Sequence, residues 1–262
     1  MRTPTFVMLG VLTAGVAEAQ SLAERILAPR NGTVRITFAS RPELCGDGET
    51  FISDRSRGEH NYVNYERGDG RGWRRACLDG PARVAISLFD GSIRRVRVYV
   101  GGAWRNTGAE DVHDLGVVSA PRAAEALLAL ARQNARGKEA IFAATVADSV
   151  SIGPDLLRLA KDDRTPRESR KTAVFWLSQM AGDSATAGLE DLATDDDEDR
   201  EVREQAVFAL SQLRHDEGIP ALIKVARTNA DPGIRRKAIF WLGQSDDPRV
   251  LALFEELLTK RR

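Results

Sequence analysis

Polar residues that could take part in catalysis or metal binding gather at two places in the first half of the chain. The first is an insert between Cys45 and Cys77 that is rich in Gly, Asp, Asn and Arg. Its candidate acids, bases and metal ligands are Asp47, Glu49, Asp54, Glu59 and His60. The second is the run Asp111, His113 and Asp114. One histidine and two aspartates are metal-ligand types, but in a connecting segment they are more typical of solvated caps. We therefore predict no catalytic residue, no cofactor, no cofactor-binding residue and no metal site.

The sequence also lacks the common catalytic signatures. It has no glycine-rich phosphate loop, no GxSxG motif and no helical His–Glu pair of a metalloprotease. The densest charge run, Asp195–Asp199, lacks the glycine and the distal glutamate of an EF-hand loop. We expect this run to be a solvated loop that leads into a helix.

Arginines recur on one predicted strand, Ser92–Val100. Its valines alternate toward a core and leave Arg95, Arg97 and Tyr99 on the opposite face, while Arg94 breaks the alternation and indicates a bulge. Two interpretations are open for this face. It is a solvated surface whose charges prevent strand pairing, or it binds an anion or a partner, with Arg95 and Arg97 as candidate partner-binding residues.

The elements around this strand predict a small β-rich module. Ser21–Ala28 reads as a capped helix, and Thr33–Ala39 and Arg83–Phe89 alternate as strands. Asp90-Gly91 then favours a tight hairpin turn into the arginine-bearing strand. The insert before Arg83–Phe89 is expected to be mostly loop, with one or two short strands, one of them near Trp73–Leu78.

The two cysteines are expected to pair. Cys45 and Cys77 are the only cysteines, and a bridge that closes a loop of about 32 residues stabilises by about 3–4 kcal/mol in the chain-entropy model. The alternative is two free thiols. A disulfide would hold together the most irregular part of the module.

The first nineteen residues have the layout of a secretory signal peptide. Arg2 precedes an apolar run from Phe6 to about Ala17, and small residues at Ala17 and Ala19 mark the cleavage site. The run is too short to span a bilayer. We expect export to the periplasm or the medium, with no membrane span after cleavage; the alternative is an uncleaved, buried helix.

The balance of charge predicts no nucleic-acid partner. The 262 residues contain 38 basic and 38 acidic side chains. Gln20–Glu110 has 15 arginines, no lysine and 11 acids, a net charge of +4, whereas Asp111–Arg262 has 22 bases and 26 acids, a net charge of −4. Such a split is typical of two solvated surfaces; the alternative is electrostatic docking between the halves or an anionic partner for the first half.

A repeated decapeptide organises the second half. Arg170–Gln179 reads RKTAVFWLSQ and recurs as Arg203–Gln212 and Arg235–Gln244, at spacings of 33 and 32 residues. Ala140 and Phe142 lie one period further upstream. A period of this size indicates stacked helical pairs, and we count about four.

The repeat carries the pattern D-x-x-[VI]-R-x-x-A-[VI]-F-x-L-x-Q, preceded by the helical segment Ile219–Ile223. This pattern resembles HEAT repeats of the bacterial type named for phycobilisome lyases. The whole chain resembles uncharacterised secreted bacterial HEAT-repeat proteins. The resemblance implies an armadillo-like α-solenoid that acts as a protein-binding scaffold.

Helical geometry separates the repeated residues into core and rim. At 100° per residue, the Ala209 position lies in the core stripe, so Trp176 and Trp241 at the same position are expected to be buried. The phenylalanines and glutamines lie near the rim. These candidate partner-binding residues are Phe175, Gln179, Phe208, Gln212, Phe240 and Gln244. Two interpretations are open for these residues: they pack between repeats, or they form a polar ladder on a binding surface.

The sequence thus predicts an α+β chain of two modules. The expected parts are a signal peptide (1–19), a disulfide-stapled β-rich module (20–110), a linker (111–120) and an α-solenoid of about four HEAT-like repeats (121–262). We expect an exported, non-enzymatic scaffold that binds another protein, in an unknown oligomeric state. The alternatives are an enzyme or enzyme accessory with its site in the Cys45–Cys77 insert, and an assembly factor for a cofactor-bearing protein.

Overall fold

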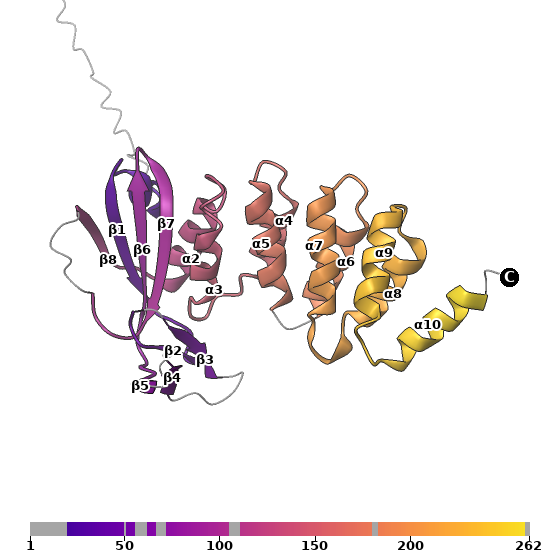
Figure 1. The fold of residues 1–262 in the computed structure, drawn as a ribbon. Coiled ribbons are helices and arrows are strands. Elements are labelled where there is room, and N and C mark those ends of the chain that lie inside the picture. The colour runs from indigo at the N-terminus through magenta and orange to yellow at the C-terminus, as the bar shows by residue number, and fades with distance from the viewer. Residues whose placement is uncertain are drawn as a thin grey trace, which may run out of the picture.

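A computed structural model describes residues 20–49, 51–55, 62–66, 72–104, 111–179 and 183–259. The predicted signal peptide lies outside these residues, as do Glu59 and His60 of the insert. The described chain has a β-containing N-terminal part with a disulfide and a helical C-terminal part, as expected (Figure 1).

A four-stranded sheet forms the centre of the N-terminal part. Its strands are β1 (Gly32–Phe38), β6 (Ala82–Phe89), β7 (Ser92–Val100) and β8 (Val112–Val117), in the order β7-β6-β1-β8. The turn between β6 and β7 has positive φ at Asp90 (49°) and Gly91 (71°), which confirms the expected tight hairpin. The register shifts between Ser87 opposite Arg95 and Leu88 opposite Ile93, so Arg94 is the extra residue of the predicted bulge.

Strand β8 corrects the expected linker over residues 111–120. It pairs in parallel with β1, with Val112 beside Thr33 and His113 beside Val34. The other edge of β1 is already paired with β6, so β8 satisfies the free edge of β1. Its exposed polar residues concealed the strand pattern in the sequence.

The insert is more regular than expected. It contains two antiparallel ribbons, one of β2 (Leu44–Gly46) with β3 (Ile52–Asp54) and one of β4 (Tyr62–Glu66) with β5 (Gly72–Ala76). The disulfide between Cys45 and Cys77 is present, as predicted. Next to it, Gly46 and Leu78 exchange two backbone hydrogen bonds of 3.0 and 2.7 Å.

The helical part packs in two layers (Figure 1). Helix α1 (Leu22–Leu27) precedes the sheet, with the expected capping box between Ser21 and Glu24. The helices after the sheet are α2 (Ala120–Leu130), α3 (Glu139–Thr145), α4 (Gly153–Lys161), α5 (Arg167–Ser178), α6 (Asp183–Thr194), α7 (Arg200–Ser211), the 3-10 turn η2 (Arg214–Asp216), α8 (Ile219–Thr228), α9 (Pro232–Leu242) and α10 (Pro248–Thr259). Each even-numbered helix from α2 to α8 packs against the next odd-numbered one, and α3, α5, α7 and α9 contact one another in sequence.

The sheet and the helices share one continuous core. Buried side chains of β1, such as Ile36 and Phe38, belong to the same apolar cluster as those of the helices. Helix α2 contacts β1, and α3 contacts β7. The Glu139 carboxylate accepts a 2.9 Å hydrogen bond from the Val96 backbone N–H on edge strand β7, which covers part of that edge. The first helical pair therefore serves both the sheet and the helical array.

The repeated Asp and Arg of the sequence motif hold the turn between the two helices of a pair. Asp199 and Asp231 are the expected N-caps, and Asp231 accepts a 2.6 Å hydrogen bond from Gly233 N–H. The Arg235 guanidinium donates to the carbonyls of Asn229 and Ala230 in the preceding turn, at 2.6 and 3.0 Å. These contacts fix each turn against the next helix.

Buried arginines extend this tie across units. Arg203 donates to the Asp196 carboxylate at 2.7 Å and to the Asn229 side chain at 3.0 Å. The equivalent Arg170 donates to the Ala160 carbonyl at 2.8 Å and pairs with the Glu198 carboxylate. Part of the acidic run Asp195–Asp199 therefore accepts hydrogen bonds from buried arginines, rather than lying wholly in solvent.

Candidate functional site

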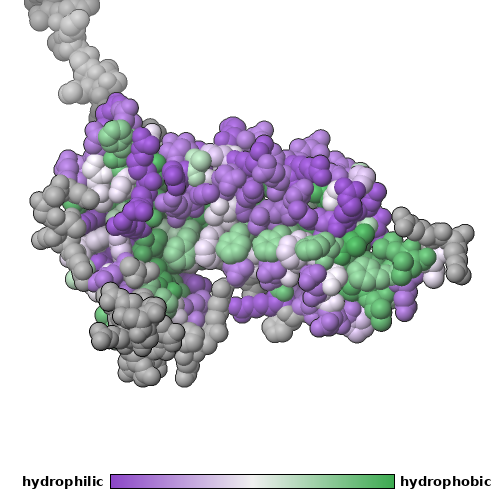
Figure 2. All heavy atoms as spheres, viewed as in Figure 1, coloured by the Kyte–Doolittle hydropathy of each residue, from purple (hydrophilic) through white to green (hydrophobic). Residues whose placement is uncertain are grey.

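Apolar side chains form a band across the odd-numbered helices. Figure 2 shows this band running over α3, α5, α7 and α9 and reaching α10. We call its rings the aromatic band. They are Phe142, Phe175, Trp176, Phe208, Phe240 and Trp241. Phe175 is 37% exposed and Phe240 is 56% exposed, unusually open positions for large apolar side chains that recur at fixed spacing.

Ring contacts hold the aromatic band in place. Phe142 of α3 stacks on Trp176 of α5 with ring centroids 5.2 Å apart, and Phe208 of α7 lies 5.0 Å from Trp241 of α9. The tryptophan position alternates along the array, because fully buried Ala143 and Ala209 occupy it in α3 and α7. Each indole thus packs on the phenylalanine of the preceding odd-numbered helix, which has alanine at the tryptophan position. Such contacts order the rings before any partner binds.

The indoles are less buried than helical geometry predicts. Trp176 and Trp241 are half-buried and pack against the edge of the core rather than inside it. The neighbouring helix has a buried alanine at the equivalent position. The larger indole lies further out, against a phenylalanine ring of that helix. The expectation of full burial was therefore wrong, and both tryptophans belong to the surface band.

Trp176 also lines a hollow between the helices and the β2–β3 ribbon. This cavity has a volume of about 330 Å³. Its apolar wall consists of Leu44, Ile52, Phe142, Val146 and Trp176. The Arg41–Asp54 ion pair, with its N–O distance of 3.3 Å, lies in the same lining. The aromatic band thus begins in a concave apolar pocket that carries a polar pair.

The recurring glutamines lie at helix ends. Gln179 and Gln212 are C-cap residues, and their amides donate to Ser178 and Ser211 at 3.2 and 3.1 Å. Those serines in turn donate to the carbonyls of Phe175 and Phe208. Gln244 lies just beyond the C-cap of α9 and is exposed. Two of the three candidate glutamines therefore have a local role in finishing a helix.

Charged side chains border the aromatic band. They come from the N-terminal turns of the same helices, whereas most of the rings lie nearer the C-terminal ends. Lys138, the N-cap residue of α3, and Lys171 of α5 both lie 3.4 Å from Glu168, and Lys171 lies 3.2 Å from Glu201 of α7. The positive charge of Lys171 lowers the pKa of Glu168, and a hydrogen bond from Lys138 acts in the same direction.

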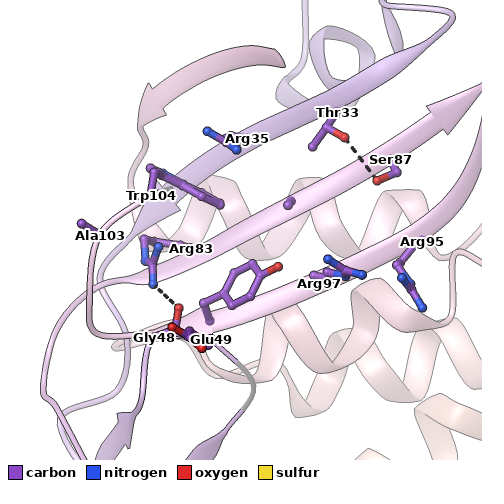
Figure 3. Close-up of a pocket in the computed structure, with 12 residues that line it drawn as sticks. Thr33, Arg35, Gly48, Glu49, Arg83, Ser87, Arg95, Arg97, Ala103 and Trp104 are labelled. Atoms are coloured by element: carbon purple, nitrogen blue, oxygen red, sulfur yellow. Dashed lines mark hydrogen bonds between the residues drawn. The ribbon is translucent and has the colours of Figure 1, made fainter. Parts of the chain in front are cut away.

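Arg95 and Arg97 line a second site on the outer face of the sheet (Figure 3). The structure brings them together with Arg35 of β1, Arg83 of β6 and Trp104 around a cavity of about 370 Å³. We call this site the arginine hollow. Arg35 and Arg83 were not predicted from the sequence as site residues. Each alternates along its own strand with apolar residues that face the core, and this alternation could have placed both arginines on the outer face of the sheet.

The polar residues of the insert mostly have structural partners. The Asp47 carboxylate accepts hydrogen bonds from the backbone N–H groups of Glu49 and Phe51, at 2.9 and 3.0 Å. Asp54 pairs with Arg41. In the second cluster, His113 Nε2 lies 3.4 Å from the Asp111 carboxylate. Within the described ranges, no group of three or more His, Cys, Asp and Glu side chains is arranged to hold a metal ion.

One family model matches the chain. Residues 195–262, which include α7 to α10, match HEAT repeats. The match supports the expectation of a HEAT-repeat protein, in the region that contains both Asp N-caps, Asp199 and Asp231. No curated protein sequence matches the chain. In the part of the chain that the structure describes, none of the helices has the length and apolar character needed to cross a membrane.

Proposed function

We propose that this protein is an exported scaffold that binds another protein on the aromatic band. The single observation that carries the proposal is the recurrence of mutually ordered rings, either exposed or half-buried, on α3, α5, α7 and α9. Protein interfaces combine an apolar, aromatic centre with a polar rim. The aromatic band and its lysine–glutamate border have this composition, and ordered rings reduce the entropy lost on binding.

The proposed scaffold is an α-solenoid of about four HEAT-like repeats. The pairs α2–α3, α4–α5, α6–α7 and α8–α9 are the repeats in this proposal, and their motif resembles HEAT repeats of the phycobilisome-lyase type. Stacked units present one residue position many times along an extended surface. Such a surface suits a long or repetitive segment of a partner protein.

The experiment compares partner recovery by variants of the two layers of helices. The wild-type protein and a Phe175→Ser, Phe240→Ser variant are used as affinity baits in the periplasmic fraction of the source cells. The matched control, Arg158→Ser, Arg227→Ser, alters exposed residues of the even-numbered helices α4 and α8. We expect a partner that the control retains and the phenylalanine variant loses. Equal recovery by all three baits would contradict the assignment.

Export is tested separately, at the predicted cleavage site. Mass spectrometry of the full-length gene product expressed in the source cells should find a mature chain that begins at Gln20. An intact N-terminus in the cell interior would reject the secretory interpretation of residues 1–19. The disulfide is compatible with an oxidising compartment.

A further inference from the structure

The outer face of the central sheet carries positive charge around one cavity (Figure 3). Among the described residues, its lining contains four arginines and one carboxylate, that of Glu49. The hydroxyl groups of Thr33, Ser87 and Tyr99 and the indole of Trp104 complete the polar and aromatic walls. This face lies opposite the core face of the sheet and is separate from the aromatic band.

Strand register builds the hollow around a small residue. Ala85 of β6 has Arg35 on one side and Arg97 on the other, as Cα partners in neighbouring strands. The row above it is Thr33, Ser87 and Arg95. Neighbouring strands lie about 4.8 Å apart, so the two arginines flank a gap of about 10 Å floored by a methyl group.

Buried contacts fix two of the guanidinium groups. Arg83 is 4% exposed and donates to the Gly101 carbonyl at 2.6 and 3.1 Å and to the Gly48 carbonyl at 2.8 Å. Arg35 is 9% exposed and lies 4.7 Å from the Trp104 ring centre. Burial lowers the pKa of Arg83, the phenol of Tyr99 acts in the opposite direction, and the charge of Arg35 lowers it further.

Two glycines bring the tryptophan over the sheet. Gly101 and Gly102 follow β7 with φ of 69° and 68°, values that favour glycine. A Cβ on Gly101 would lie 2.7 Å from the Leu78 carbonyl. The reversed chain places the Trp104 ring near both Arg35 and Arg83, and its N–H donates to Thr37 Oγ1 at 3.1 Å. The wall of the hollow is therefore positioned by backbone as well as side chains.

We propose that the arginine hollow binds the phosphate or sulfate group of an anionic ligand between Arg35 and Arg97. A guanidinium fork binds an oxyanion through two parallel hydrogen bonds. A carboxylate offers only two coplanar oxygens, whereas a tetrahedral oxyanion can accept from forks on both sides and from the Thr33 and Ser87 hydroxyls. Tyr99 and Trp104 provide flat walls for the organic part of such a ligand.

The alternative is that these arginines only discourage pairing at the edge of the sheet. Arg94 separates the two explanations. It is an exposed arginine of the same strand, but it lies beside the Phe89 ring at 5.2 Å and does not line the hollow. If the arginines act only through their charge at the sheet edge, replacing Arg94 or Arg97 should have the same effect on anion binding. If they form an anion-binding site, replacing Arg97 should weaken binding much more than replacing Arg94.

The test is a calorimetric titration of the disulfide-intact protein at constant ionic strength. The probes are inorganic phosphate, inorganic sulfate and a sugar phosphate monoester. We expect saturable binding of at least one probe, weakened about tenfold or more by Arg97→Gln and changed less than about twofold by the control Arg94→Gln. Tighter binding of the sugar ester than of the free ion would support the role of the aromatic walls.

A second variant tests the shape of the hollow without changing its charge. Ala85→Leu fills the floor and should also weaken binding about tenfold or more, with a thermal unfolding curve recorded to show that the sheet is intact. If that variant unfolds, Arg97→Gln alone decides the matter, because Arg97 is exposed. Absence of saturable binding to every probe, or equal losses in Arg94→Gln and Arg97→Gln, would overturn the proposal.

Discussion

The two surfaces of this protein differ in how they concentrate binding groups. The arginine hollow gathers charge from three strands of one sheet around a single alanine. The aromatic band instead distributes rings along four helices, one or two on each. Strand register produces a compact site suited to a small group, whereas stacking of similar helical pairs produces an extended surface suited to a macromolecule.

The surfaces also depend on different supports. The hollow rests on loops next to the disulfide, since Arg83 is held by the Gly48 and Gly101 carbonyls. The band rests on contacts between consecutive helices and on buried arginines such as Arg170 and Arg203. A change in one support should therefore affect one surface more than the other.

Removing the disulfide should have the largest effect and should affect the hollow first. In Cys45→Ser, Cys77→Ser, we expect a loss of about 3–4 kcal/mol of unfolding free energy, because the unfolded chain is no longer constrained. Urea unfolding followed by circular dichroism measures the loss. Oxyanion binding should fall while partner recovery through the aromatic band persists. A protein as stable as wild type would show that the bridge contributes little.

Truncating Trp176 should have the next largest effect and should affect the band. Trp176→Ala removes the stacking on Phe142 and is expected to cost about 2–3 kcal/mol, at or below the lower end for buried aromatics because the indole is half-buried. Trp176→Phe is the matched control and should retain most of the stability. Oxyanion affinity should stay unchanged in both variants. A loss below about 1 kcal/mol would mean that the ring is not a support of the band.

Changing Phe240 should separate binding from stability. Phe240→Ser is expected to change the unfolding free energy by about 1 kcal/mol or less, because more than half of the side chain is already exposed. Partner recovery should nevertheless fall. Denaturant midpoints and bait recovery, measured on the same preparation, give both values. Strong destabilisation would instead assign this ring to the core of the last helical pair.

Acid should weaken the charged border of the band by a small amount. The pKa of Glu168 is lowered in the folded protein, so its contribution is present above the unfolded pKa of about 4.3 and is lost as the pH falls through the folded value. The Glu168 side chain is 47% exposed, and screening by solvent limits the effect to below about 1 kcal/mol. Glu168→Gln should be less stable than wild type at pH 7 and show no deficit near pH 3. The control is Glu255→Gln, which changes an exposed carboxylate of α10. If Glu168→Gln had the same stability deficit at pH 7 and pH 3, the ion-pair explanation would be contradicted.

The sequence was informative where a pattern is local. The period of about 33 residues locates α5, α7 and α9 and the phenylalanines on them, and alternation along one strand exposes Arg95 and Arg97. The Asp90-Gly91 turn and the Arg94 bulge were likewise predictable, because each depends on a few consecutive residues.

Features that need pairing between distant segments were not predictable. The hollow requires β1, β6 and β7 in register, and Arg35 and Arg83 belong to strands separated by more than 40 residues. Strand β8 was not predicted because its polar sequence lacks a strand pattern, and the strand forms through its pairing with β1. The outward position of Trp176 depends on which ring the neighbouring helix presents, which single-helix geometry does not include.

Site-specific crosslinking tests whether the aromatic band is the protein-binding surface. A photoreactive phenylalanine analogue is placed at Phe240 on α9 or at Arg158 on α4, and the source cells are irradiated. We expect one discrete crosslinked product from position 240, little or none from position 158, and loss of the product when Phe175→Ser is added. Equal crosslinking from both positions, or none from position 240, would show that the partner does not bind on the aromatic band.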